Sequence, residues 1–234
     1  MDASWTTVHV LALRLDPSWR RLPEEARGQD AAAFLEAARA AGDRVRTYTY
    51  SMVGLRTDAD LLLWRLGPSV AALEETAASL MRTGLGRHLV ATHAMIGLVR
   101  TSQYVAKPTP QDQAMFTGQR ASHLIVYPFV KTADWYLLGR DERQRMMNEH
   151  IKIGHQYPMI RQLLAYSFGL DDQEFIVAYE TDDLRAFQDL VHALRATEGR
   201  RYTLRDTPIL VGIHRPLGEI LALLGAPVAA EARR

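Results

Sequence analysis

Apolar and polar residues alternate along this chain with two different periods. Residues 6–15 alternate in steps of two, as in a half-buried strand, whereas residues 29–42 carry apolar residues at helical spacing. The pattern then predicts further strands and one further helix before residue 101. The strands are expected at 45–55, 59–67 and 89–100, and the helix at 69–86. The first half therefore reads strand–helix–strand–strand–helix–strand.

The second half repeats this order. A polar stretch at 101–122 holds two prolines and a glycine, which predicts a linker or long loop. The elements expected after it are strands at 123–131, 162–170, 174–182 and 207–216, and helices at 139–156 and 183–197. The second set follows the first after about half the chain, which indicates an internal duplication.

A strand–helix–strand–strand–helix–strand unit is the ferredoxin-like arrangement. Two copies predict an α+β protein with two antiparallel sheets, each backed by helices. The fold class expected is a duplicated ferredoxin-like fold of the dimeric α/β-barrel type, since barrel closure would limit exposed sheet edges. We place the N-terminal half at 1–118 and the C-terminal half at 119–234.

Composition excludes several classes of function. The 234 residues are 47% hydrophobic and 24% charged, as in ordinary globular proteins, and the net charge of +1 argues against a general nucleic-acid surface. Cysteine is absent, so neither a disulfide nor a thiolate metal site can form. No apolar run reaches the roughly 20 residues of a membrane span, and the N-terminus does not read as a signal peptide. A cytoplasmic protein is the expectation.

One of the eight histidines stands apart in its surroundings. His150 follows Met146 and Met147 on the predicted helix 139–156, and Gly154 leaves the same face open one turn later. This pattern suits an axial ligand to haem iron, although a half-buried surface histidine would fit it as well. His155 falls about 140° around the helix from His150, so the two cannot share one metal ion from a regular helix.

Three stretches carry a resemblance. "LIVYPFVKTADWYLLGRDERQRMMNEH", "LLAYSFGLDDQEFIVAYETDDLRAFQDLVHALRATEGRR" and "TPILVGI" resemble the chlorite dismutase superfamily, and within it the coproheme decarboxylases. A Y-P-F-V-K segment, then W-Y, then a helix ending in histidine is specific as a set. The resemblance is strong over about residues 120–216 and mainly architectural before them. It implies the same duplicated ferredoxin-like barrel that the apolar pattern predicts.

The resemblance implies a haem site in the second half. His150 matches the proximal iron ligand, and Glu198 matches the acid that accepts a hydrogen bond from that histidine's other nitrogen. Trp135 stands at the family's spacing before the ligand, as a residue that contacts the cofactor. Arg195 matches an arginine that binds propionates, and Tyr104 is expected to reach a propionate.

The catalytic residues implied are Tyr127, Lys131 and Gln162. Tyr127 matches a tyrosine that becomes a radical and takes a hydrogen atom from a propionate, and Lys131 matches a lysine near a reactive propionate. Gln162 matches the distal position, where chlorite dismutases carry an arginine. Arg161 is its neighbour and would face the opposite side of a strand, so a shift of one residue would exchange the two.

The function implied is a decarboxylase that uses hydrogen peroxide to convert iron coproporphyrin III to haem b. A chlorite dismutase or haem peroxidase is the alternative if an arginine lines the pocket. A non-catalytic haem-binding carrier is another, in which Tyr127 would only pack. The partners implied are a porphyrin and peroxide, with neither nucleic acid nor membrane, and the family's usual assembly implies a homopentamer.

Overall fold

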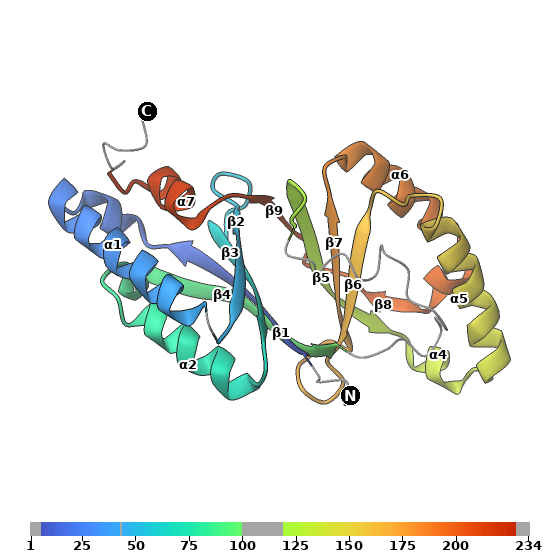
Figure 1. Ribbon diagram of the computed structural model, residues 1–234. Helices are drawn as coiled ribbons and strands as arrows, with labels where there is room; N and C mark the ends of the chain where they lie inside the picture. Colours follow the sequence, from blue (N-terminus) through green and yellow to red (C-terminus); the bar gives the residue numbers. More distant parts are fainter. Residues whose placement is uncertain (1–5, 43, 100–118, 228–234) are drawn as a thin grey trace. The chain divides into compact units, whose positions relative to one another are not determined.

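The computed structural model describes residues 6–42, 44–99 and 119–227. The chain forms two compact units, one of residues 1–96 with 212–234 and one of residues 97–211 (Figure 1). The predicted division between 118 and 119 borders a segment outside the described residues, and it stays a prediction. The elements inside each unit follow the predicted order.

The first unit is an antiparallel sheet backed by helices. Its strands lie in the order β4-β1-β3-β2, which is the ferredoxin-like order. The elements are β1 (Thr6–Leu15), η1 (Pro17–Arg21), α1 (Glu24–Ala41), β2 (Arg46–Ser51), β3 (Leu61–Gly67), α2 (Val70–Met81), η2 (Leu85–His88), β4 (Leu89–Val99) and α7 (Leu217–Leu224). Beginning in the second unit, β9 (Leu210–His214) pairs its last two residues with β2.

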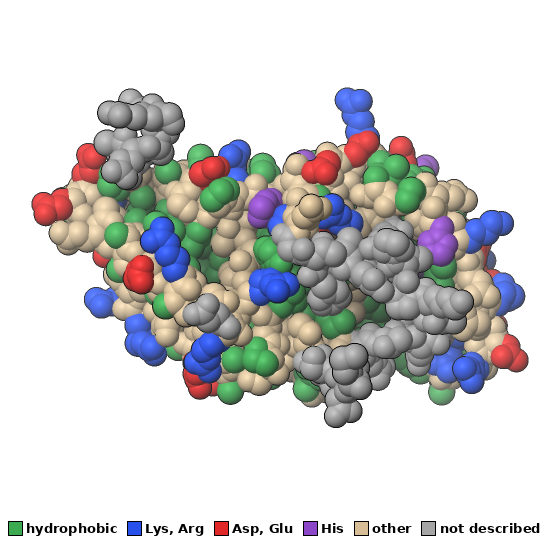
Figure 2. Space-filling model, in the orientation of Figure 1, with side chains coloured by type: hydrophobic (Ala, Val, Ile, Leu, Met, Phe, Trp, Pro, Cys, Tyr) green, Lys and Arg blue, Asp and Glu red, His purple; other side chains and the backbone are tan. Residues whose placement is uncertain are grey.

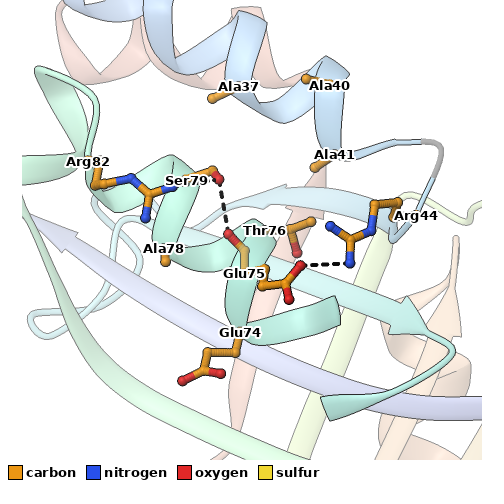
Figure 3. A pocket seen from close by; sticks show the side chains of 10 residues that line it. All are labelled: Ala37, Ala40, Ala41, Arg44, Glu74, Glu75, Thr76, Ala78, Ser79 and Arg82. Carbon is orange, nitrogen blue, oxygen red and sulfur yellow. Dashed lines mark hydrogen bonds and ion pairs between the residues drawn. The ribbon is translucent and has the colours of Figure 1, made fainter. Parts of the chain in front are cut away.

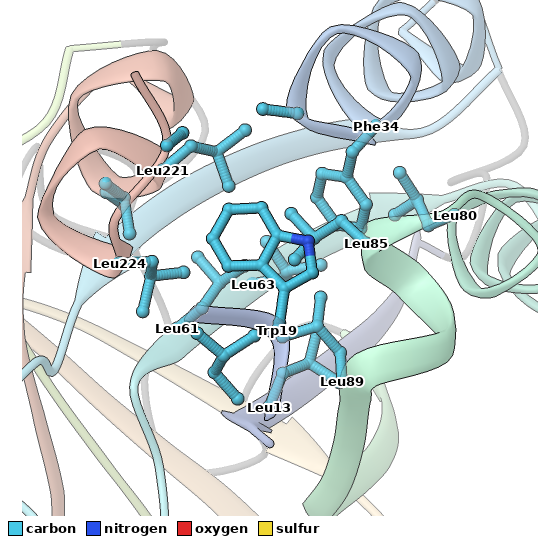
Figure 4. Packing of buried hydrophobic residues seen from close by; sticks show 14 of the residues in the cluster. Leu13, Trp19, Phe34, Leu61, Leu63, Leu80, Leu85, Leu89, Leu221 and Leu224 are labelled. Carbon is cyan, nitrogen blue, oxygen red and sulfur yellow. The ribbon is translucent and has the colours of Figure 1, made fainter. Parts of the chain in front are cut away.

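Aromatic and leucine side chains fill the space between this sheet and its helices. Trp19 lies fully buried among them, and its indole N–H donates to the Asp30 carboxylate at 2.9 Å (Figure 4). Phe34 of α1 and Leu63 of β3 are also almost fully buried in this cluster. Burying such side chains contributes about 1.5–3 kcal/mol each, so this core holds the unit together.

The second unit repeats the arrangement and carries the candidate site. Its elements are β5 (His123–Lys131), α4 (Ala133–Leu137), α5 (Arg140–Gly154), β6 (Arg161–Tyr166), β7 (Phe175–Thr181), α6 (Leu184–Arg195), η4 (Glu198–Tyr202) and β8 (Thr203–Arg205). β7 pairs antiparallel with both β5 and β6, and β8 pairs with β5. The short elements α4, η4 and β8 were not predicted.

Helices α5 and α6 cover one face of this sheet (Figure 1). Asp183 caps α6, because its carboxylate accepts hydrogen bonds from the backbone N–H groups of Arg185 and Ala186. The apolar stripe of α6, with Phe187 and Leu190, packs on the strands as its strong amphipathic pattern predicted. The sheet face under these helices is where the candidate residues lie.

Candidate active site

Strand β5 presents Tyr127 and Lys131 on the face covered by α5 and α6. Alternate residues of a strand point to the same side. Ile125, Tyr127 and Phe129 belong to the cluster that packs with residues of both helices. The Lys131 ammonium lies 5.3 Å from the centroid of the Phe129 ring, so it continues the same row. The four-residue spacing seen in the sequence therefore places a phenol and an ammonium on one surface.

Tyr127 is paired with a second tyrosine. The ring centroids of Tyr127 and Tyr179 are 6.4 Å apart, and Tyr179 packs on Phe187 of α6 at 5.3 Å. Burial, followed by the interaction with the Tyr179 hydroxyl, raises the pKa of Tyr127 well above its ordinary value. The phenol therefore keeps its proton at every physiological pH.

Lys131 lies above an indole. Its ammonium is 4.2 Å from the ring centroid of Trp135 and donates to the Gly199 carbonyl at 3.3 Å. The Lys131 backbone N–H donates to the Glu174 carboxylate at 2.7 Å. Burial, with a smaller contribution from the positive charge of Arg200, lowers the pKa of Lys131 to about 8. The ammonium remains charged at neutral pH, but at a cost in free energy.

The Trp135 side chain is buried, and its indole ring lies beneath the Lys131 ammonium. Its indole ring packs against Tyr202 of η4 with centroids 5.7 Å apart. Helix α4, which carries Trp135, begins only two residues after Lys131, so the chain turns back on itself there. The predicted role of Trp135 in contacting the cofactor is not tested by these contacts.

His150 is half-buried on α5 and has a neutral imidazole. Burial, and to a smaller extent the positive charge of Lys131, lowers the pKa of His150 to about 4. Among the described residues, none forms a hydrogen bond with its ring. His155 instead is exposed and forms the C-cap of α5. The His150 imidazole is thus unprotonated at neutral pH, as a metal ligand must be.

The pairing of β6 with β7 separates Gln162 from Arg161. Gln162 lies opposite Tyr179, and Arg161 lies opposite Glu180. Residues opposite one another in an antiparallel pair project to the same side. Gln162 therefore shares the helix-covered face with Tyr179, while Arg161 shares the other face with Glu180, whose carboxylate lies 3.2 Å from the Arg120 guanidinium. The register therefore places Gln162 on the helix-covered face, and its role at the distal position stays a prediction.

Two arginines share one carboxylate beside Tyr127. The Arg195 and Arg200 guanidiniums lie 2.8 Å and 2.7 Å from the same oxygen of Asp206. Asp206 acts to raise the pKa of Tyr127, and Arg195 acts to lower it, so both lie within electrostatic reach of the phenol. Arg195 was predicted as a propionate-binding residue, whereas Arg200 and Asp206 were not singled out.

Two predicted residues remain to be placed. The Glu198 carboxylate lies 2.8 Å from the Arg145 guanidinium, one turn before His150 on α5. Its hydrogen bond to the His150 ring stays a prediction, because the described structure contains no such bond. Tyr104 lies outside the described residues, so its contact with a propionate also stays a prediction.

Sequence reasoning missed Tyr179, Arg200 and Asp206. The alternation in "FIVAYET" shows which residues of β7 share a face, but the partner of each residue depends on the register between strands. That register brings Tyr179 beside Tyr127. Arg200 lies in the short helix η4, which was not predicted, and Asp206 lies in irregular chain after β8, where no period indicates a direction. A basic cluster at 200–201 followed by an acid was the signal available.

A groove lies elsewhere, between α1 and α2 of the first unit. It has a volume of about 500 Å³, a floor of alanines and a rim that includes Arg44, Glu75 and Arg82 (Figure 3). Arg44 and Glu75 form an ion pair across it at 2.7 Å. None of the residues that line it is a histidine, tyrosine or lysine. The groove therefore contains none of the residues predicted for the site.

Comparison with known proteins decides the family. The profile of the family described as chlorite dismutase matches residues 24–215, which is most of the chain. The chain belongs to the chlorite dismutase family. A coproheme decarboxylase from Mycolicibacterium smegmatis is 34% identical to this family member over 197 residues, covering 83% of this chain and 84% of the relative.

Solved structures of the chlorite dismutase family agree. A mutant chlorite dismutase from Candidatus Nitrospira defluvii matches with a TM-score of 0.86 and 28% identity, covering 93% of this chain and 94% of that one. The enzyme from the same organism in complex with imidazole matches with a TM-score of 0.85 and 28% identity, covering 95% and 96%. The predicted α+β, ferredoxin-like fold class and the family resemblance are confirmed.

The composition leads to expectations about the helices and the surface charges of the protein. In the described parts of this family member, no helix combines the length and the apolar character that crossing a membrane requires. Figure 2 shows lysine and arginine side chains interspersed with aspartate and glutamate on the face that is drawn, as the net charge of +1 suggests.

Proposed function

We propose that this protein binds an iron porphyrin with His150 as the axial ligand, and that it is a peroxide-dependent coproheme decarboxylase. The observation that carries the proposal is the gathering of Tyr127, Lys131 and a neutral His150 on one side of the second unit. The coproheme decarboxylase relative supports the substrate. Iron coproporphyrin III would be the substrate and haem b the product.

The donor set fits iron in a porphyrin better than a bare metal ion. No group of three or more metal-binding side chains exists among the residues that the structure describes. A porphyrin supplies four nitrogens itself, so one neutral imidazole is sufficient. His150 meets this requirement, because its pKa of about 4 leaves the ring unprotonated at neutral pH.

The surroundings also fit a flat apolar ring with acidic side chains. Leu164 lies opposite Val177 on the helix-covered face and is nonetheless 40% exposed, which offers an apolar contact. Lys131 and Arg195 supply cations for propionate carboxylates. A porphyrin that carries carboxylates would require this combination, an apolar surface for its ring and positively charged groups for its carboxylates.

The chemistry assigned to the chain is hydrogen-atom transfer and carboxylate orientation. The bound iron porphyrin, oxidised by peroxide, supplies the oxidising power. Tyr127 keeps its phenolic proton in the resting protein and can lose it together with an electron, so it can then take a hydrogen atom from the β-carbon of a propionate. The Lys131 ammonium orients the carboxylate that leaves as carbon dioxide.

The reaction balances with one peroxide for each carboxyl group. A propionic acid group loses a hydrogen from its β-carbon and its carboxyl group as carbon dioxide, which releases two electrons and two protons, one from the β-carbon and one from the carboxylic acid, and leaves a vinyl group. The two electrons and two protons reduce one hydrogen peroxide to two waters. Two such steps convert iron coproporphyrin III to haem b, by way of a three-propionate intermediate.

Chlorite dismutation is the second candidate, because the solved relatives named above are chlorite dismutases. A fixed positive charge on the helix-covered face would favour it. Gln162 rather than Arg161 shares that face with Tyr179, which favours the decarboxylase. A haem carrier would need neither Tyr127 nor Lys131 to be reactive.

The decisive experiment adds iron coproporphyrin III to the purified protein, titrates hydrogen peroxide and follows products by mass. Sequential loss of two carboxyl groups is expected. Tyr127→Phe should bind the porphyrin and fail to decarboxylate it. Tyr48→Phe is the matched control, because Tyr48 lies on strand β2 of the first unit and the substitution removes the same hydroxyl group. A fully active Tyr127→Phe variant would exclude the radical role.

Binding without loss of carbon dioxide would favour the other candidates. Chlorite would then be added to the haem-loaded protein, with oxygen release as the readout. The homopentamer implied by the family resemblance is a separate proposal, and light scattering of the purified protein tests it.

A further inference from the structure

Asp206 pairs with two arginines, one of which, Arg195, lies within electrostatic reach of Tyr127. A single oxygen of its carboxylate lies 2.8 Å from Arg195 and 2.7 Å from Arg200. The Asp206 side chain is only 18% exposed, whereas those of Arg195 and Arg200 are 40% and 37% exposed. The carboxylate therefore lies on the inner side of the two guanidiniums, which keep further N–H groups directed to solvent.

This cluster lies beside the residues proposed to act on the propionates. Asp206 and Arg195 both influence the pKa of Tyr127, and Arg200 contributes to lowering that of Lys131. Three cations, Lys131, Arg195 and Arg200, lie there with two carboxylates, Asp206 and Glu174, which leaves an excess of positive charge. A propionate approaching Tyr127 would meet guanidiniums that are already paired with a carboxylate of the chain.

We propose that Asp206 is an internal competitor for porphyrin carboxylates, and that it makes this site selective for porphyrins that carry a carboxylate beside Tyr127. The proposal rests on the proposed function. A propionate at that position displaces Asp206 from Arg195 or Arg200, replacing one charge-assisted pair with another. Once the carboxyl group has left, Asp206 pairs with both arginines again, and the product loses a point of attachment.

A purely structural ion pair predicts the opposite sign. If Asp206 only holds the segment after β8 against the end of α6, its removal would loosen both arginines and weaken porphyrin binding. If Asp206 competes, its removal frees the arginines and strengthens the binding of a tetracarboxylate porphyrin. The binding of a dicarboxylate porphyrin, which lacks the two carboxyl groups that react, would change much less.

The test compares Asp206→Asn with the unaltered protein in the binding of two metal-free porphyrins, coproporphyrin III and protoporphyrin IX. Quenching of tryptophan fluorescence reports binding without iron or peroxide. We expect the affinity for coproporphyrin III to rise about fivefold and that for protoporphyrin IX to rise less than about twofold, since one partly exposed ion pair is replaced. Asp206→Glu, which restores the carboxylate, should return both affinities toward the original values.

Asp189→Asn is the matched control, because Asp189 is an exposed acid on α6 and the substitution removes the same charge. Weaker or unchanged coproporphyrin binding by Asp206→Asn would overturn the proposal in favour of a structural role. Equal strengthening for both porphyrins, repeated by Asp189→Asn, would overturn it in favour of long-range charge alone. In either case, peroxide-driven decarboxylation by the unaltered protein would leave the proposed function standing.

Discussion

Replacing Lys131 with methionine should stabilise the ligand-free protein. Burial lowers the pKa of Lys131 from its ordinary 10.5 to about 8, so the folded protein holds a charged ammonium at a cost. That difference corresponds to at most about 3 kcal/mol in the free energy of unfolding at neutral pH, because one pKa unit equals about 1.4 kcal/mol. Methionine removes the charge and keeps an unbranched side chain of similar length.

Two lost contacts reduce this gain. The ammonium lies 4.2 Å from the Trp135 ring centroid, an interaction worth about 1 kcal/mol at a partly exposed site. It also donates to the Gly199 carbonyl at 3.3 Å, which contributes about 0.5 kcal/mol at this length. The Lys131→Met variant is therefore expected to be more stable by about 1–2 kcal/mol near pH 7.

The pH dependence identifies the cause. In the folded protein Lys131 loses its proton near pH 8, whereas in the unfolded chain it keeps the proton until about pH 10.5. Between these values the unfolded state binds more protons, so the unaltered protein becomes more stable as the pH rises. The advantage of Lys131→Met should be complete below pH 8 and should shrink as the pH approaches 10.5.

Urea denaturation followed by tryptophan fluorescence, near pH 7 and again near pH 9.5, measures both effects. Lys152→Met is the control, because Lys152 is exposed on α5 and its substitution should change little. A Lys131→Met variant that is less stable near pH 7, or whose advantage does not narrow at high pH, would refute this reasoning. The same variant should bind coproporphyrin more weakly, so that stability and function change in opposite directions.

Two paired substitutions test the remaining assignments. His150→Ala should abolish the Soret shift on adding iron coproporphyrin III and leave the affinity for metal-free coproporphyrin within about threefold, because only the iron needs the imidazole. His155→Ala should behave like the unaltered protein. The reverse result would make His155 the ligand. Gln162→Ala should slow peroxide-driven decarboxylation about tenfold or more, as expected for a polar group at the reacting centre, whereas Arg161→Ala, on the other face of β6, should not. A slow Arg161→Ala enzyme with an unaffected Gln162→Ala enzyme would show that the distal assignment is wrong by one residue.

The sequence predicts strands better where their ends are marked by a change of pattern. The ranges 6–15 and 123–131 agree with β1 and β5 to the residue. The predicted strand 162–170 ends earlier, at Tyr166, because the chain turns at Ser167 and reaches a positive φ of 70° at Gly169. Apolar residues in that turn imitate the continuation of a strand.

The predicted starts of α2, α5 and α6 agree with the structure to within one residue, but the start of the first helix was not visible in the pattern. The first helix begins at Glu24 rather than at 29, directly after Pro23, with Glu24 and Glu25 in its first turn. Those residues are polar and exposed, so they add nothing to the apolar period from which the helix was predicted. Backbone and electrostatic preferences at the N-terminus determine this start.

Some residues of the candidate site could be placed from the sequence, and others could not. Tyr127 and Lys131 could be placed on one face from the sequence, because both lie on one strand at even spacing. Tyr179 could not, since its place beside Tyr127 depends on the register between β5 and β7. Asp206 lies in irregular chain, where sequence alone does not give a position. Residues within an element were predictable, and contacts between elements were not.

The two units differ at equivalent positions, and the difference agrees with a proposed site in only one of them. Strand β1 pairs with β3 in the first unit, and β5 pairs with β7 in the second. Counted from the start of each pairing, the fifth pair of residues lies under the helices in both units. It is Leu11 with Leu63 in the first unit and Tyr127 with Val177 in the second. Trp19, which is fully buried, packs among the leucines of the first unit. An apolar core fills the space between this face of the sheet and its helices, and the burial of these side chains stabilises the first unit.

The second unit gives up part of that stability at the corresponding surface. In the pairing of β5 with β7, the third pair places Tyr179 opposite Ile125. The helix-facing residues of β5 end in the desolvated ammonium of Lys131, whereas the corresponding residue of β1 is Leu15. A buried cation lowers stability unless an anion pairs with it. A bound carboxylate would supply that anion, so the same property that makes Lys131 costly in the free protein strengthens the binding of an acidic porphyrin.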